Sequence, residues 1–88
     1  MQIIGKSQTA IDADILETKI AEARAERDRR IIDAMKRVER YTTQTAAKIP
    51  TTDSPEAYAA ILVYLQALRD VPEQAGFPGS VIWPRLDI

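Results

Sequence analysis

The chain has 88 residues, with 12 lysines and arginines against 13 aspartates and glutamates, and it contains neither histidine nor cysteine. This length allows one small domain over residues 1–88, and the net charge of −1 gives no reason to expect a nucleic-acid or membrane partner. The absence of cysteine excludes disulfides and fits a reducing cytoplasm, and no apolar run approaches the roughly 18 residues of a membrane-spanning helix.

Residues 1–9 are expected to form an extended N-terminal segment. Ile3 and Ile4 are apolar, and Gly5 interrupts them. Two interpretations stay open: an edge strand, or a segment that becomes ordered on a partner. The segment has neither the basic region nor the long apolar core of a signal peptide.

A long helix is predicted over about residues 10–48. This stretch has no glycine or proline and is rich in alanine, glutamate and arginine, which favour helices. The threonine-rich stretch after Tyr41 weakens the helix, because β-branched side chains lose conformational entropy there. A break anywhere from Tyr41 to Lys48 is therefore left open, and Ile49-Pro50 ends the helix at the latest.

The apolar residues of this helix fall into two patches. The second half carries a narrow seam suited to another helix, formed by Ile31, Met35 and Val38 and continued by Thr42, Thr45 and Ile49. The first half carries Ile11, Ile15, Leu16 and Ile20. Between the patches, the run 24–30 is charged except for Ala25.

A second helix is predicted over about residues 55–69. Ser54 is the expected N-cap, and Pro55 suits the first helical position. The helix is apolar on more than one side, so it should be covered. We expect it to pack on the first helix as an antiparallel hairpin, and the residues expected in the core of that all-α hairpin are Ile31, Met35, Val38, Tyr58, Ile61, Leu62, Leu65 and Leu68.

The two helices differ in length, which leaves part of the first one uncovered. At 1.5 Å per residue the second helix is roughly 22 Å long, against roughly 55–60 Å for the first. The patch of Ile11, Ile15, Leu16 and Ile20 then lacks a partner within the chain. Self-association or partner binding by residues 10–23 is the main mechanistic expectation, and fraying in the free protein is the alternative.

Charge is concentrated in the middle of the chain. Residues 24–40 carry seven basic and four acidic side chains, and the segments on either side each have a net charge of −2. A solvated helix face, supported by pairs such as Glu26–Arg30 and Asp33–Arg37, is the simpler interpretation. A docking band for an acidic partner is the sharper one.

Catalytic chemistry is not expected, and neither is a cofactor. Without histidine or cysteine, the three serines of the chain have no imidazole base. Asp12, Asp14 and Glu17 lack the glycine and the ligand series of a calcium loop, so no metal site is expected. The arginines are interleaved with acids, which argues against nucleic-acid binding.

Residues 70–88 are expected to form an extended tail rich in proline, glycine and aromatic residues. Val71-Pro72 closes the second helix, since a residue before proline avoids the α region. Such a tail is stable only if its large side chains are covered by this chain or by a partner; these are Phe77, Pro78, Val81, Ile82, Trp83 and Pro84. Packing of Phe77 and Trp83 on the hairpin's own core is favoured, and a ligand arm is the alternative.

The C-terminal sequence resembles the signature of the phage tail assembly chaperone family. The residues concerned are Leu68–Gln74, Gly76–Pro78 and Val81–Pro84, and a looser similarity covers Arg24–Ile31, Arg40-Tyr41, Tyr58 and Gln66. The resemblance implies a non-catalytic interaction module that binds a phage tail or tail-fibre protein, as a homo-oligomer or hetero-complex, in the bacterial host cytoplasm during assembly. The alternative is a structural component of the tail, baseplate or fibre joint that stays in the virion as a helical oligomer.

Overall fold

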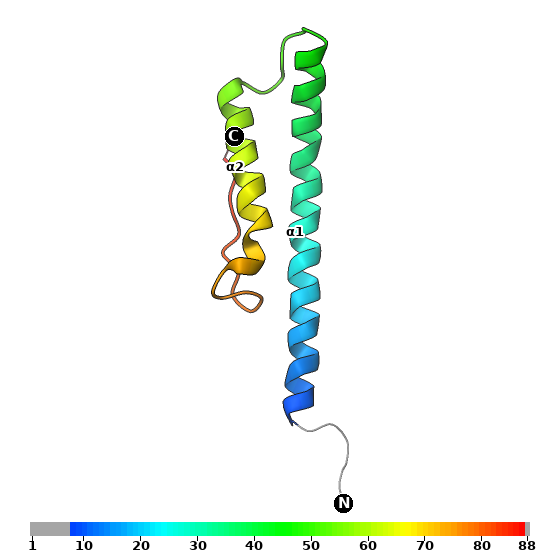
Figure 1. Cartoon of the computed structure of the whole chain (residues 1–88), viewed down its shortest axis with the longest axis vertical. Helices are drawn as coiled ribbons and strands as arrows, with labels where there is room; N and C mark the ends of the chain where they lie inside the picture. Colours follow the sequence, from blue (N-terminus) through cyan, green and yellow to red (C-terminus); the bar gives the residue numbers. More distant parts are fainter. Residues whose placement is uncertain (1–7, 88) are drawn as a thin grey trace, which may run out of the picture.

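The structure, a computed structural model, describes residues 8–87, with side chains from residue 13 onward. The chain forms two antiparallel helices, α1 (Gln8–Ala46) and α2 (Pro55–Arg69), followed by a short 3₁₀ helix, η1 (Val71–Glu73) (Figure 1). No strand occurs among the described residues. The predicted all-α hairpin is therefore confirmed. Most of the expected extended segment 1–9 lies outside the described residues, and α1 already begins at Gln8.

α1 is one continuous helix of 39 residues, about 58 Å long at 1.5 Å per residue. It passes through the threonine-rich stretch after Tyr41 without a break. The N–H groups of Lys48 and Ile49 donate to the carbonyls of Thr45 and Gln44 at 3.0 and 3.1 Å. This is the Schellman arrangement, and it requires the left-handed conformation that Lys48 adopts at φ 61°.

α2 begins and ends at the predicted residues. The Ser54 hydroxyl accepts a hydrogen bond from the N–H of Ala57 at 3.0 Å, and Pro55 occupies the first turn. These contacts confirm the predicted N-cap. The helix stops at Arg69, and Val71-Pro72 opens η1 directly afterwards.

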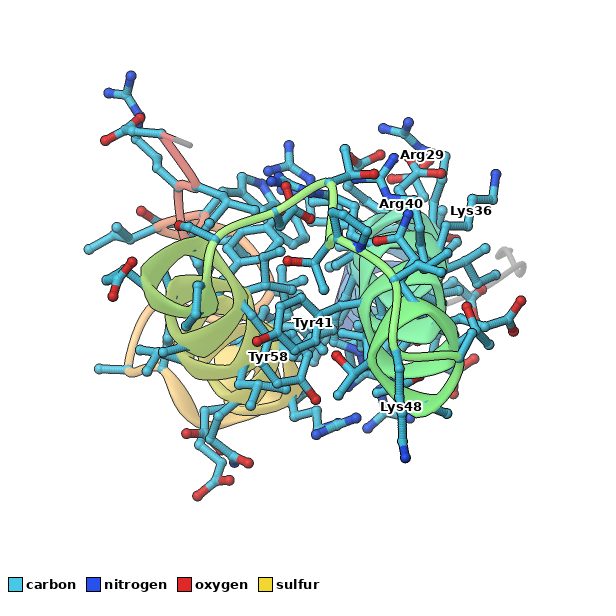
Figure 2. All side chains as sticks on the ribbon, turned by 90° about the horizontal axis from the view of Figure 1, so that it is seen from above. Arg29, Lys36, Arg40, Tyr41, Lys48 and Tyr58 are labelled. Carbon is cyan, nitrogen blue, oxygen red and sulfur yellow. The ribbon has the colours of Figure 1, made fainter. Side chains whose placement is uncertain are left out.

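Contacts at the upper end of the hairpin fix the register of the two helices. The rings of Tyr41 and Tyr58 stack with centroids 4.0 Å apart and planes 6° from parallel, between the helices (Figure 2). In the connection, the Gln44 side chain accepts from the N–H of Thr52 at 2.9 Å and donates to its hydroxyl at 3.0 Å. α2 is therefore held at one position along α1.

The core lies where the helices meet. Ala34, Ile61 and Leu65 are buried together, and the half-buried residues that pack against them are Ile31, Val38, Tyr64 and Leu86. Leu68 and Val71 are also fully buried, at the end of α2 and the start of η1. Ala34 is small, so the larger side chains of Ile61 and Leu65 can pack against α1 at this position.

The chain then turns and runs back beside α2 (Figure 1). We call residues 74–87 the tail; its first part, 74–80, is a series of turns, and residues 81–87 have no helix or strand structure. Because Leu86 contacts the core cluster, the tail forms a third layer over one side of the two-helix interface.

Candidate interaction site

The part of α1 ahead of Ile20 extends beyond the rest of the molecule (Figure 1). We call residues 8–19 the arm. Ile15 and Leu16 are 50% and 49% exposed, Ile20 is half-buried, and Ala23 is the first buried residue. The side chain of Ile11 lies outside the described residues. The arm thus presents large apolar side chains on a well-formed helix, with no covering element from the described chain.

The tail packs on its own chain. The Arg30 guanidinium lies over the Trp83 ring, with its central carbon 4.4 Å from the ring centroid. Half-burial extends to the other tail residues singled out from the sequence, which are Phe77, Pro78, Val81 and Pro84. Ile82 is the exception at 80% exposure. Five of the six expected tail residues are therefore partly covered within the chain, and Ile82 points to solvent.

A glutamine holds the turn region of the tail closed. The Gln74 side chain accepts from the N–H of Ile82 and donates to its carbonyl, both at 2.8 Å. Inside this closure, the N–H of Ser80 donates to the carbonyl of Gly76 at 2.7 Å. A side chain at Gly76 would place its Cβ 2.3 Å from the Ser80 carbonyl oxygen, so glycine is required there. No sequence pattern indicated these contacts, because they join residues that are not helical.

The closed turn reaches α1 at the border of the arm. Pro78, Gly79, Val81 and Trp83 face Lys19, Glu22, Ala23 and Glu26 across a shallow pocket. Glu26 accepts hydrogen bonds from Arg29 at 2.5 Å and from Arg30 at 2.6 Å. These bonds lower the pKa of Glu26 to about 2 from an ordinary value of 4.5. The predicted Glu26–Arg30 pair is thus confirmed, and it orients the arginine that covers Trp83.

A second charge cluster ties the connection to α1. Asp53 accepts from Arg37 at 2.7 Å and from Arg40 at 3.2 Å. The hydrogen bond from Arg37 is the main cause of a lowered pKa at Asp53. Asp33 was expected to form an ion pair with Arg37. Its carboxylate Oδ1 lies 3.7 Å from Nζ of Lys36. The sequence signal for the Asp53 cluster is the spacing of three between the arginines, which places both on one side of α1.

Of the eight residues expected in the hairpin core, six are buried or half-buried and two are exposed. Ile61, Leu65 and Leu68 are buried, and Ile31, Val38 and Tyr58 are half-buried. Met35 and Leu62, however, are 40% and 43% exposed. Ala34, which the sequence analysis did not single out, occupies the buried position beside Met35.

Met35 and Leu62 are exposed because the tail covers the other side of the hairpin. Asp33, Arg37 and Tyr64 line a pocket together with Leu86 of the tail. Met35 is two positions from Asp33 and from Arg37, and two positions on an α-helix correspond to a rotation of about 200°. Leu62 is likewise two positions from Tyr64. We call the side that carries Ile31, Met35 and Leu62 the open face.

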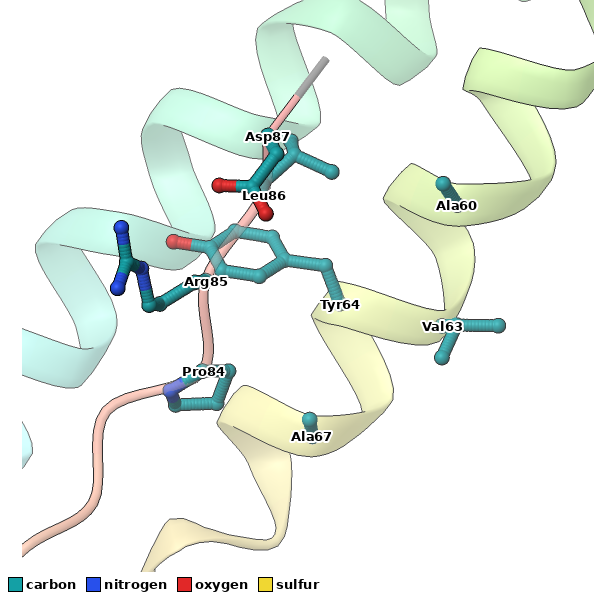
Figure 3. A pocket seen from close by; sticks show the side chains of 8 residues that line it. All are labelled: Ala60, Val63, Tyr64, Ala67, Pro84, Arg85, Leu86 and Asp87. Carbon is teal, nitrogen blue, oxygen red and sulfur yellow. The ribbon is translucent and has the colours of Figure 1, made fainter.

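The tail also forms an open, largely apolar pocket of about 450 Å³ with the outer side of α2 (Figure 3). The residues that line it are Ala60, Val63, Tyr64, Ala67, Pro84, Arg85, Leu86 and Asp87. The Tyr64 ring lies beside the tail, and Val63 points away from it. Arg85 and Asp87 are the charged residues of this lining.

The described residues contain no group of three or more histidine, cysteine, aspartate or glutamate side chains that could hold a metal ion. Nor does any helix in residues 8–87 have the length and apolarity needed to cross a bilayer. What the described part does present is apolar surface: the arm, the open face and the outer side of α2.

The fold and these surfaces define a small all-α protein, a helical hairpin strapped on one side by its own C-terminal tail. Comparison with protein families then gives a specific assignment. The family model described as phage tail assembly chaperone protein matches residues 20–86. The chain belongs to this family, as its C-terminal signature had suggested, and its role lies in phage tail assembly. No match was found among curated proteins, and none among solved structures.

Proposed function

We propose that this protein is a non-catalytic chaperone that binds a phage tail or tail-fibre protein through the arm of α1, in the host cytoplasm while the tail assembles. The observation that carries the proposal is the half exposure of Ile15 and Leu16 on a continuous helix. Apolar side chains at helical spacing normally face a core, and within residues 8–87 no core lies beside these. An apolar segment of a client protein would supply it.

The boundary of the family match supports separate roles for the two parts of the chain. The match begins at residue 20, where the tail starts to cover α1, and it leaves out the arm. Residues 20–86 would provide the common scaffold. The arm would provide the contact with one particular client.

Co-purification tests this proposal directly. The chain is co-expressed with each tail and tail-fibre protein of its phage, and a client should be captured by the unmodified chain. Leu16→Asp should reduce capture at least tenfold, because it places a charge in an apolar contact. Ile32→Asp is the matched control, since Ile32 is an exposed apolar residue of α1, 60% accessible, on a different side of the helix. Equal capture by both variants would contradict the proposal.

The alternative, a structural component of the tail, baseplate or fibre joint, predicts a different location. Its basis is the same arm, which could join α1 to neighbouring subunits in the particle. Mass spectrometry of washed phage particles separates the two roles. A chaperone should be absent from particles and abundant in the lysate, and a structural subunit should be present in a fixed copy number.

A further inference from the structure

We infer that the arm of one copy binds the open face of a second copy, so that the free protein forms a reciprocal dimer. The inference rests on the same arm as the proposed function, but it concerns the protein without its client. It names a second surface, the open face, and assigns its occupant. The first step is that no described element of the same chain covers Ile15 and Leu16, and that α1, one unbroken helix from Gln8 to Ala46, cannot fold the arm back onto the hairpin.

The second step is the shape of the open face. Ile31 and Met35 of α1 lie on this side, and Leu62 lies on the corresponding side of α2. The stacked Tyr41 and Tyr58 set the antiparallel register, which brings Met35 and Leu62 to about the same level. The tail covers the opposite side only. The open face therefore presents exposed apolar side chains from both helices, with a pocket on α1 that Ile31, Ile32 and Met35 help to line, and a third helix can pack on it.

The third step is charge. Arg24 is seven residues before Ile31 and Arg69 is seven after Leu62, so each continues the open face by about two helical turns. Both are exposed, and neither takes part in an ion pair among the described residues. The arm has three acids and one lysine, a net charge of −2. Its Glu17 is exposed and also has no ion pair within the described chain.

The two surfaces thus complement each other in polarity and in charge. An antiparallel pair of α1 helices that cross near residue 23 would place residues 8–19 of one copy beside about residues 27–38 of the other. The arm is about 18 Å long, the same length as residues 27–38 of the facing helix. The two folded units would point in opposite directions, and two-fold symmetry would bury both arms and both open faces at once.

Light scattering over a range of concentrations tests the inference on the full chain without a client. The unmodified chain should be a dimer. Glu17→Lys and Arg24→Glu should each raise the dimer dissociation constant about tenfold, because each places like charges together twice in a symmetric pair. A mixture of the two variants should form a heterodimer. In it, the two reversed charges attract each other at one interface, and the other interface keeps its original charges. A monomer at every concentration, or a dimer that neither reversal weakens, would overturn the inference.

Cross-linking distinguishes the open face from other surfaces. Because the chain has no native cysteine, only the introduced thiols can react. The double variant Leu16→Cys/Leu62→Cys should give a covalent dimer with a short bis-maleimide. The control Leu16→Cys/Val63→Cys moves the second thiol to the neighbouring residue on the outer side of α2 and should not give this product. Equal cross-linking of both would contradict the docking site. Client capture is measured separately, so a failed dimer test leaves the proposed function standing, and the reverse also holds.

Discussion

The two ends of α1 have the same helical backbone but different support. From Ala23 onward one side of the helix packs against α2 and the tail, and ion pairs join it to the connection at Asp53. In the arm, Ile15 and Leu16 are half exposed and no described element packs over them, so the stability of the arm within the monomer should depend mainly on helix propensity and on continuity with the rest of α1. Tertiary packing provides most of the stability of protein helices, so the two regions should respond differently to substitution, to exchange and to pH.

The largest difference is expected from truncating an apolar side chain in each region. Leu65→Ala removes a side chain that is 2% exposed and should lower the free energy of unfolding by about 3 kcal/mol. Leu16→Ala, in the arm, should change it by less than about 0.5 kcal/mol in the monomer. Urea denaturation at low concentration measures both. A cost above about 1 kcal/mol for Leu16→Ala would show that the arm is packed within the chain.

The tail should contribute the next largest effect. Trp83→Ala removes a half-buried ring and its contact with Arg30, and we expect a loss of about 2 kcal/mol. Ile82→Ala, at the neighbouring exposed position, should cost less than about 0.5 kcal/mol. Thermal unfolding of both variants checks this. If Trp83→Ala left stability unchanged but abolished client capture, the tail would be a client-binding segment and not part of the hairpin's own packing.

The turn that Gln74 and Ile82 close should determine where protection of the α1 amides from hydrogen exchange begins. Gly76→Ala forces a Cβ against the Ser80 carbonyl and should cost about 1.5 kcal/mol in loop distortion. Gly79→Ala is the control, because a Cβ there meets nothing within 4 Å. Hydrogen exchange should show faster exchange around Lys19 to Glu26 in the first variant only. Identical exchange in both variants would mean that the turn does not protect this border.

At the opposite end of α1, one substitution should stabilise the folded part without affecting the arm. Lys48 adopts a left-handed conformation that glycine tolerates at lower cost, so Lys48→Gly should add about 1 kcal/mol. Ala46→Gly, inside the last helical turn, should instead remove about 0.5–1 kcal/mol. Denaturant midpoints measure the pair, and exchange of the arm amides should stay the same. A lower midpoint for Lys48→Gly would contradict the prediction.

The smallest expected effect is the loss of folding stability at acidic pH. Glu26 has a folded-state pKa of about 2 and Asp53 also has a lowered pKa, so the unfolded chain binds more protons at these sites in acid. Their contribution is complete above pH about 4.5 and is lost as pH falls toward 2. Glu26→Gln should flatten this acid-dependent loss of stability, which denaturant midpoints between about pH 2 and pH 5 would measure. Parallel acid profiles for the unmodified chain and Glu26→Gln would contradict the assignment.

Much of this architecture could be predicted because its signals are local. Helix-forming composition without glycine or proline between Gly5 and Pro50 predicted α1, and the Ser54-Pro55 pair predicted the start of α2. The difference in helix length predicted an apolar arm without cover. The C-terminal signature pointed to the family before any contact was known, because its prolines, glycines and aromatic residues are spaced in a specific way.

Other features depend on residues far apart in the sequence, and only the tertiary structure decided them. The helix continues past Tyr41 because its stacking with Tyr58 and the turn at Lys48 outweigh the low propensity of the threonines. Ala34 rather than Met35 lies in the core because Ile61 and Leu65 of α2 pack on the side of α1 that carries Ala34. The tail covers one side and leaves Met35 and Leu62 exposed, since a single extended segment can cover only one side of a two-helix hairpin. The sequence by itself therefore determined the elements and their apolar surfaces, whereas three-dimensional packing decided which of those surfaces remained open.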